Sequence, residues 1–211
     1  MASKTIGVLA LQGGYREHGA HLRDCGIEPI YVTRPEELAQ CAGLIIPGGE
    51  SSCLRRLLRG FEVDTAIVNA VKQDGMHVWG TCAGAILCAD KVVGEEPCLG
   101  LIECEIERNI FGSQLSSFYE EVSIPGICET KERLVYIRAP GIRRIWGNTR
   151  SILTSHDVIT AAENDLVLVT SFHPELSGTR AFHFYFIAKC GLASHDARPH
   201  EWTRTAWMER G

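Results

Sequence analysis

The first part of the chain alternates between short apolar runs and segments with helical spacing. Apolar runs at residues 5–11, 30–32, 44–46 and 76–79 predict strands, and the spacing within residues 15–25, 51–58, 63–71 and 85–89 predicts helices. Neighbouring strands in such a chain pair in parallel, because each strand is followed by a crossover connection. We therefore expect a mostly parallel central sheet with helices on both faces.

Three glycine-containing loops follow predicted strands in this part of the chain. They contain Gly13, the pair Gly48 and Gly49, and the turn at Thr81 and Cys82. Ligands of parallel α/β sheets bind beyond the carboxyl ends of the strands, so we expect the three loops on one rim of the sheet. The helix after the second loop is expected to be capped by a serine, at position 51 or 52.

The second part of the chain has a different pattern. Runs at residues 101–107, 133–137, 144–146, 158–161 and 166–171 predict short strands with few helices between them, which indicates an antiparallel extension of the sheet. A closing helix is predicted over residues 178–190, with Phe182, Tyr185 and Phe186 facing the core. The predicted fold is thus a three-layer α/β sandwich. Residues 1–193 are expected to form one domain, and the polar tail over 194–211, with Trp202 and Trp207, is expected to be flexible.

Composition excludes several functional classes. The formal net charge of −5 over 211 residues argues against a nucleic-acid partner, and the basic pairs Arg55–Arg56 and Arg143–Arg144 are expected to be solvated. No apolar run is long enough to span a membrane, and the N-terminal residues do not resemble a signal peptide, so a cytoplasmic location is expected. The nine cysteines are odd in number and lack CxxC spacing, so we expect free thiols and neither a metal site nor a cofactor.

The sequence GTCAG at residues 80–84 is the strongest chemical signal. It matches G-x-C-x-G between a predicted strand and a predicted helix, the pattern of a nucleophile elbow. A cysteine at a helix N-terminus is favoured as a thiolate, so Cys82 is the predicted nucleophile. Most of the other eight cysteines are interpreted as small buried hydrophobic residues.

A general base is predicted in the sequence FHPE at residues 172–175, directly after a strand. The proline favours an extended conformation at His173, and in an extended chain residues two apart point to the same side. Glu175 can therefore orient the imidazole, which gives a Cys82–His173–Glu175 triad of nucleophile, base and orienter. The alternative is a histidine with a purely structural role.

Acyl chemistry also requires donors for the developing oxyanion. The backbone amide of Ala83 is one candidate, because it follows the nucleophile. Gly48 and Gly49 provide the other, since a chain without side chains can approach the site closely. On its own, this glycine pair would be interpreted as a simple turn.

Together these motifs resemble the class I, or triad, glutamine amidotransferase superfamily. PGGES (47–51), GTCAG and FHPE carry this resemblance. Further stretches are similar to the family of glutaminase subunits of pyridoxal 5′-phosphate synthase, over about residues 5–193. They are ALQGGYREH (10–18), LGLIECEIERNIFGSQLSSF (99–118), YIRAP (136–140) and HPELS (173–177).

The resemblance implies a function and a partner. Such a subunit hydrolyses L-glutamine and passes ammonia to a barrel-shaped synthase subunit, which builds vitamin B6, in a hetero-oligomer. It also implies the glutamine-binding residues, which are Gly49, Glu50, Ser51, Arg108, Ile137 and Arg138. A cation for the α-carboxylate and acceptors for the α-ammonium are chemically reasonable for free glutamine. Without the motif, either arginine would be interpreted as part of a surface ion pair.

Two positions depart from the family pattern, which usually has alanine or aspartate at Gly14 and arginine at Ser113. We expect these changes to affect partner contacts and not the activity. Two other functions stay open at this point: a glutaminase subunit for a different acceptor, and a catalytically silent regulatory subunit. We also expect weak activity without the partner, if the resting glycine loop directs a carbonyl into the oxyanion site.

Overall fold

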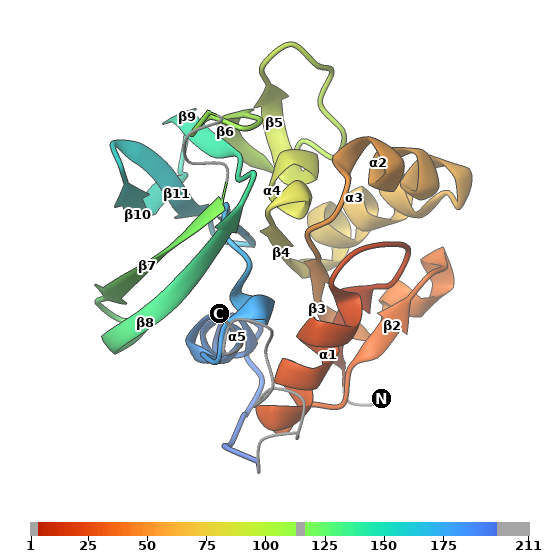
Figure 1. Cartoon of the computed structure of the whole chain (residues 1–211). Helices are drawn as coiled ribbons and strands as arrows, with labels where there is room; N and C mark the ends of the chain where they lie inside the picture. The colour runs from red at the N-terminus through yellow and green to blue at the C-terminus, as the bar shows by residue number, and fades with distance from the viewer. Residues whose placement is uncertain (1–3, 113–116, 198–211) are drawn as a thin grey trace.

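The structure is a computed structural model that describes residues 4–112 and 117–197. Its first half has the predicted alternation (Figure 1). The elements there are β1 (Thr5–Leu9), α1 (Tyr15–Asp24), β2 (Ile30–Val32), a 3-10 helix (Pro35–Gln40), β3 (Cys41–Ile46), α2 (Ser51–Gly60), α3 (Val63–Asp74), β4 (His77–Thr81) and α4 (Ala83–Cys88). The second half contains β5 (Ala89–Val92), β6 (Ile102–Glu107), β7 (Ser117–Ile124), β8 (Cys128–Ile137), β9 (Gly141–Ile145), β10 (Arg150–Ser155), β11 (Val158–Glu163), β12 (Val167–Thr170), a 3-10 turn (Pro174–Leu176) and α5 (Ala181–Lys189).

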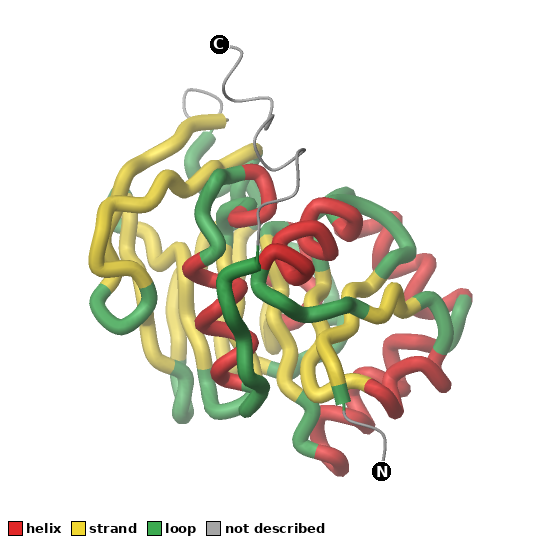
Figure 2. Tube along the Cα trace, turned by 90° about the horizontal axis from the view of Figure 1, so that it is seen from below, coloured by secondary structure: helices red, strands yellow, loops and turns green. Residues whose placement is uncertain are grey.

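The main sheet has ten strands and is parallel in its middle. The strand order is β2-β1-β3-β4-β12-β11-β9-β6-β5, with β10 paired to β11. The pairs between β2 and β12 are parallel, whereas β12–β11, β11–β9 and β9–β6 are antiparallel. Figure 2 shows helices around the parallel half, while the other half consists mainly of strands and loops. The predicted antiparallel extension is therefore confirmed.

Side chains of the central strands alternate between two hydrophobic cores, one on each face of the sheet. Leu44 and Ile46 of β3 lie in the core that α2, α3 and α4 cover, whereas Ile45 lies in the core that α1 and α5 cover. In β4, Val78 belongs to the first core and Trp79 to the second. All five side chains are fully buried, as expected for strands covered on both faces. This arrangement is the predicted three-layer α/β sandwich.

Some strands differ from the prediction. Residues 166–171 were assigned to the antiparallel extension, but β12 pairs in parallel with β4 in the middle of the sheet. Residues 133–137 belong to β8, which pairs with β7 in a separate two-stranded sheet. Local apolar patterns identify a strand without specifying its partner, which explains both errors. The pattern also missed β5, β7 and β10, because much of each strand is polar and exposed.

The cap of α2 also differs from the prediction. Neither serine caps the helix, because the N-cap residue is Glu50. Its carboxylate accepts hydrogen bonds from Ser52 N at 3.0 Å and from Cys53 N at 2.6 Å. These bonds lower the pKa of Glu50. The cap therefore holds an ionised carboxylate directly after the glycine loop.

The beginning of the predicted tail is hydrogen-bonded to the end of α1. His195 N donates to Cys25 O at 3.2 Å, and Ala197 N donates to Asp24 O at 2.9 Å. Arg180 also forms an ion pair with Asp196 at 3.1 Å. Trp202 and Trp207 lie outside the described residues, so the flexibility of the remaining tail stays a prediction.

We predict that Phe186→Ala strongly destabilises the fold. Phe186 on α5 is fully buried, and its ring centroid lies 5.6 Å from that of Trp79. Removing the ring leaves a cavity between α5 and the sheet, so the free energy of unfolding should fall by about 3–5 kcal/mol in urea titrations. Phe61→Ala is the matched control, because Phe61 is 52% exposed, and it should change stability by less than about 0.5 kcal/mol. Similar effects of the two variants would contradict this assignment of the core.

Candidate active site

Cys82 lies in a strained turn between β4 and α4. Its φ of 47° and ψ of −104° are rarely adopted by residues with a side chain. The turn is tightly packed, because a Cβ on Gly80 would lie 2.5 Å from Gly84 O and one on Gly84 would lie 2.0 Å from Ile46 O. The flanking glycines are thus required sterically, as in a nucleophile elbow. Strain of this kind is typical of functional positions.

His173 and Glu175 lie beside this turn, after the end of β12. His173 Nδ1 is 2.8 Å from Glu175 Oε1, and the imidazole lines the same cavity as Cys82. Glu175 lies in a 3-10 turn, so the expected contact is present but the extended geometry expected for it is wrong. The segment is fixed by His173 N, which donates to Val135 O at 2.8 Å. The structure therefore brings the three predicted side chains together.

His173 and Glu175 shift each other's pKa in opposite directions. Burial lowers the pKa of His173, but the charge of Glu175 and hydrogen bonds to Cys82 and Glu175 raise it well above its ordinary value. Burial raises the pKa of Glu175, but His18 and His173 hold it well below its usual range. The arrangement therefore favours an imidazolium beside a carboxylate. This is the state that a base reaches after it takes a thiol proton.

The predicted oxyanion loop lies against the same residues. A Cβ on Gly48 would lie 2.4 Å from His173 Cε1 and 3.2 Å from Cys82 Cβ, so the loop touches both side chains. Gly48 N donates to Thr81 Oγ1 at 3.0 Å, and Gly48 O accepts from Gly14 N at 3.3 Å. A trans peptide places its N–H opposite its C=O, so the N–H of Gly49 points away from Gly14. The Gly49 amide is therefore the group that this loop offers to the site, because the Gly48 amide is engaged.

A cavity of about 390 Å³ opens at this rim of the sheet. Its volume lies within the range of about 300–1,000 Å³ that is usual for small-molecule sites. Most of the predicted site residues line it, while Glu175 lies behind His173. The lining residues are Gly49, Glu50, Ser51, Cys82, Ala83, Ile86, Arg108, Asn109, Ile137, Arg138, Pro140 and His173.

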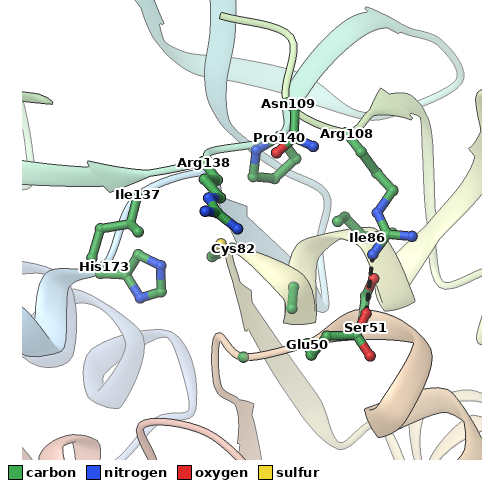
Figure 3. A pocket seen from close by; sticks show the side chains of 12 residues that line it. Glu50, Ser51, Cys82, Ile86, Arg108, Asn109, Ile137, Arg138, Pro140 and His173 are labelled. Atoms are coloured by element: carbon green, nitrogen blue, oxygen red, sulfur yellow. Dashed lines mark hydrogen bonds and ion pairs between the residues drawn. The ribbon is translucent and has the colours of Figure 1, made fainter. Parts of the chain in front are cut away.

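The two predicted arginines differ in their charge environment (Figure 3). Arg108 lies between two carboxylates, with Nη2 3.3 Å from Glu50 Oε1 and Nη1 2.7 Å from Glu95 Oε1. Arg138 has no carboxylate partner within the described ranges, and its side chain lies beside Cys82 in the cavity. Arg138 is thus a cation available to an anionic ligand, whereas the charge of Arg108 is balanced by protein groups.

Three residues near the site were missed by the sequence reasoning. Glu95 holds Arg108, Thr81 holds the amide of Gly48, and His18 lies 3.3 Å from Glu175 Oε2. Thr81 lies within GTCAG and His18 within ALQGGYREH, but neither motif assigns these residues a role, and each of the three acts through another residue. Only the arrangement of the strand ends in space brings them to the site.

Gly14 also lies at the site, although its departure from the family pattern was expected to affect partner contacts. A Cβ there would lie 2.9 Å from Glu175 Oε1, so the residue packs against the triad carboxylate. The loop after β1 therefore reaches the triad, and the effect of Gly14 on partner contacts stays a prediction. Ser113, the other departure, lies outside the described residues.

Other sequence expectations concern residues away from the site. All nine cysteines are free, and burial raises the pKa of Cys41 to about 11 and that of Cys25, Cys104 and Cys190 to about 12. Several basic residues are neutralised, since Arg143 pairs with Glu107 and Arg144 with Glu105. Among the described helices, none combines the length and apolar character needed to cross a membrane.

We predict that Glu175→Gln lowers the pKa of His173. Burial alone lowers this pKa, and the carboxylate charge is the main influence that raises it. An NMR titration of the histidine ring protons should therefore show the pKa of His173 shifting downward in the variant. The exposed His156 provides an internal control and should titrate unchanged. An unaltered pKa at His173 would mean that Glu175 does not stabilise the imidazolium.

Comparisons with known proteins agree with this geometry. The model of the SNO glutamine amidotransferase family matches residues 8–192. The chain is 50% identical to the pyridoxal 5′-phosphate synthase subunit PdxT of Syntrophus aciditrophicus, covering 97% of this chain and 93% of that protein. It is 41% identical to the subunit of the same name from Pelotomaculum thermopropionicum, over 92% and 98% of the two chains. A crystal structure of a glutamine amidotransferase superposes with a TM-score of 0.84 and 38% identity, covering 89% of this chain and 100% of the other. The chain therefore belongs to the SNO glutamine amidotransferase family.

Proposed function

We propose that this chain hydrolyses L-glutamine to L-glutamate and ammonia, and that it supplies the ammonia to the synthase subunit of pyridoxal 5′-phosphate synthase. The observation that carries the proposal is the cavity in which Cys82, in a strained turn, meets the paired His173 and Glu175. The relatives reported above, which are named as subunits of that synthase, support the choice of acceptor.

The reaction follows from the positions of the three side chains. His173 removes the proton from the Cys82 thiol, and the thiolate attacks the side-chain amide carbon of glutamine. The imidazolium then donates its proton to the departing ammonia, which leaves a thioester on Cys82. Water, activated by His173, hydrolyses the thioester and releases glutamate. Glu175 keeps the imidazole oriented and stabilises its charged form without transferring a proton.

The oxyanion of both tetrahedral intermediates requires N–H donors. The amide of Gly49 and the amide of Ala83 supply them in this proposal, because Gly49 lines the cavity and Ala83 begins α4. The Gly48 carbonyl is turned toward Gly14 in the described arrangement. Rotation of this peptide would replace the donor by a carbonyl. We propose that the synthase partner acts by favouring the orientation in which the amide faces the site.

The charges in the cavity suit a free amino acid. Arg138 binds the α-carboxylate, because of the two arginines that line the cavity it is the one without a carboxylate partner in the described structure. The Glu50 carboxylate, held ionised by the helix amides, accepts from the α-ammonium. Arg108, Ser51 and Ile137 complete the wall around the substrate, and Glu95 fixes the position of Arg108.

We predict that Cys82→Ala abolishes glutamate release while leaving the fold intact, because it removes only the attacking sulfur. The measurement is glutamate production from glutamine, with the purified chain alone and with saturating synthase. For the wild-type chain, kcat should rise on adding synthase by at most about 10²–10³-fold, the effect of one oxyanion donor, because the synthase holds the peptide with its amide toward the site and prevents its rotation.

The matched control is Cys53→Ala, since Cys53 is exposed and lies outside the cavity. It should behave like the wild type. Synthesis of pyridoxal phosphate from added ammonia should be normal with the Cys82 variant, which separates loss of hydrolysis from loss of assembly. Glutamate release by Cys82→Ala would rule out the proposed nucleophile, and an unstimulated wild-type kcat would rule out activation by the partner.

We also predict that Arg138→Ala weakens the capture of glutamine. Loss of one charge-assisted hydrogen bond corresponds to about 1.5–3 kcal/mol, or a decrease in kcat/KM of about 10- to 100-fold. Steady-state kinetics with glutamine measure this decrease, which should appear mainly as a higher KM. Arg144→Ala is the control, because Arg144 lies on an exposed strand and pairs with Glu105. Unchanged kinetics in the Arg138 variant would assign the carboxylate to another group.

A further inference from the structure

Three buried histidines lie behind the triad carboxylate, on the side away from His173. His18 and His21 belong to α1 and His183 to α5, and none is more than 1% exposed. His18 Nδ1 is 3.0 Å from His183 Nε2, and the rings of His21 and His183 stack with centroids 4.7 Å apart. The mechanism described above uses none of these side chains.

The hydrogen-bond partners determine which nitrogen of each ring carries the proton. His21 Nε2 faces the backbone oxygen of Glu175 at 3.3 Å, and this oxygen can only accept. His18 Nε2 is hydrogen-bonded to Thr81 Oγ1 at 3.3 Å, and it also lies 3.3 Å from Glu175 Oε2, an acceptor that has no hydrogen bond within the described part of the chain. Both Nε2 atoms therefore carry hydrogen.

The position of the hydrogen on the third ring, that of His183, then follows. When Nε2 alone carries hydrogen on His18, its Nδ1 has a free lone pair and accepts from the Nε2–H of His183. The buried atoms without partners among the described residues include Nδ1 of His21 and Nδ1 of His183, both of which are unprotonated acceptors in this assignment. Burial lowers the pKa of His21 to about 4 and that of His183 well below its ordinary value, so both rings are neutral. The reverse assignment would bury an unpaired N–H on His183 and direct a lone pair of His18 at the carboxylate.

We propose that His18 is a positioning residue for glutamine hydrolysis: its Nε2 is hydrogen-bonded to Thr81 Oγ1 and lies 3.3 Å from Glu175 Oε2. Glu175 is the orienter of His173, and Thr81 Oγ1 accepts the amide of Gly48 in the oxyanion loop. The imidazole of His18 thus contacts the carboxylate of the triad and, through the hydroxyl of Thr81, the glycine loop that is proposed to stabilise the oxyanion. The inference rests on the proposed function and deepens it.

A purely structural cluster is the alternative. His18 and His183 do pack against Trp79, with ring centroids 5.6 and 5.1 Å away. A metal centre is not supported, because no group of three or more His, Cys, Asp or Glu side chains in the described part of the chain is arranged to hold an ion. A structural role requires only the volume and polarity of a side chain at position 18. The positioning role requires an N–H at the place of Nε2.

The matched pair His18→Gln and His18→Asn separates the two roles. The amide nitrogen of glutamine reaches roughly the place of Nε2, whereas the amide of asparagine reaches only the place of Nδ1. In the presence of saturating synthase, His18→Asn should lower kcat by about 10- to 100-fold, the effect of losing a hydrogen bond to a charged group, with KM for glutamine changed less than about threefold. His18→Gln should recover most of the lost kcat.

Two further measurements complete the test. Thermal unfolding shows whether both variants are folded, and His77→Gln is the control because His77 lies at the opposite end of β4 and should keep wild-type kinetics. Alkylation of Cys82 by iodoacetamide, followed by peptide mass spectrometry, should slow in His18→Asn and recover in His18→Gln. The alkylation measurement requires no glutamine turnover, so it tests the role of His18 independently of the proposed function. Absence of glutamate release by the wild-type chain would reject the proposed function itself. Equal kcat values for the two folded variants, or equal alkylation rates, would overturn the positioning role.

Discussion

Glu175 is only 2% exposed, so neighbouring groups must compensate the negative charge of its carboxylate, and this requirement determines the arrangement of the site. An ionised group in a protein interior is tolerated only when it is paired and hydrogen-bonded. His173 pairs with one oxygen at 2.8 Å, and His18 lies 3.3 Å from the other. Because the charge requires an imidazolium or an N–H on each side, the same interaction that stabilises the buried group also raises the pKa of His173. The compensation of a buried charge and the preparation of a base are therefore one arrangement.

Backbone strain is concentrated around the cavity. Three of its lining residues, Cys82, Asn109 and Arg138, have positive φ although they carry side chains, with values of 47°, 52° and 45°. Each such residue costs on the order of 1–3 kcal/mol and persists only where the surroundings impose it. At Cys82 the surroundings are β4, paired with β3 on one side and β12 on the other. The parallel sheet, packed on both faces, thus supplies the rigidity that keeps the nucleophile in a conformation it would not adopt alone.

The sequence predicted the parts of this site that depend on order along the chain. Cys82 and the glycine pair after β3 each follow a buried strand of the predicted parallel sheet, so their place on the rim follows from that topology, whereas the parallel pairing of β12, which brings His173 to the same rim, was not predicted. The sequence also could not predict the contact of His18 with Glu175, since the stretch that contains His18 does not indicate which residue this side chain meets. The role of Glu50 as the N-cap of α2 could not be predicted for a different reason. Both serines after it are ordinary cap residues, and only the backbone direction at the loop decides that the glutamate accepts the amides instead.

The two ends of the cavity differ in charge because the arginines that line them have different neighbours. Around Arg108, the carboxylates of Glu50 and Glu95 and the guanidinium of Arg55, 3.6 Å from Glu95, form a network whose formal charges cancel. Arg138, in contrast, follows β8 of the separate hairpin and extends into the cavity without a carboxylate partner among the residues described. The cavity therefore has one uncompensated cation at one end and an acceptor-rich wall at the other. This polarity requires both the main sheet, which fixes Glu50 and Cys82, and the hairpin, which places Arg138, so the hairpin is part of the site as much as of the fold.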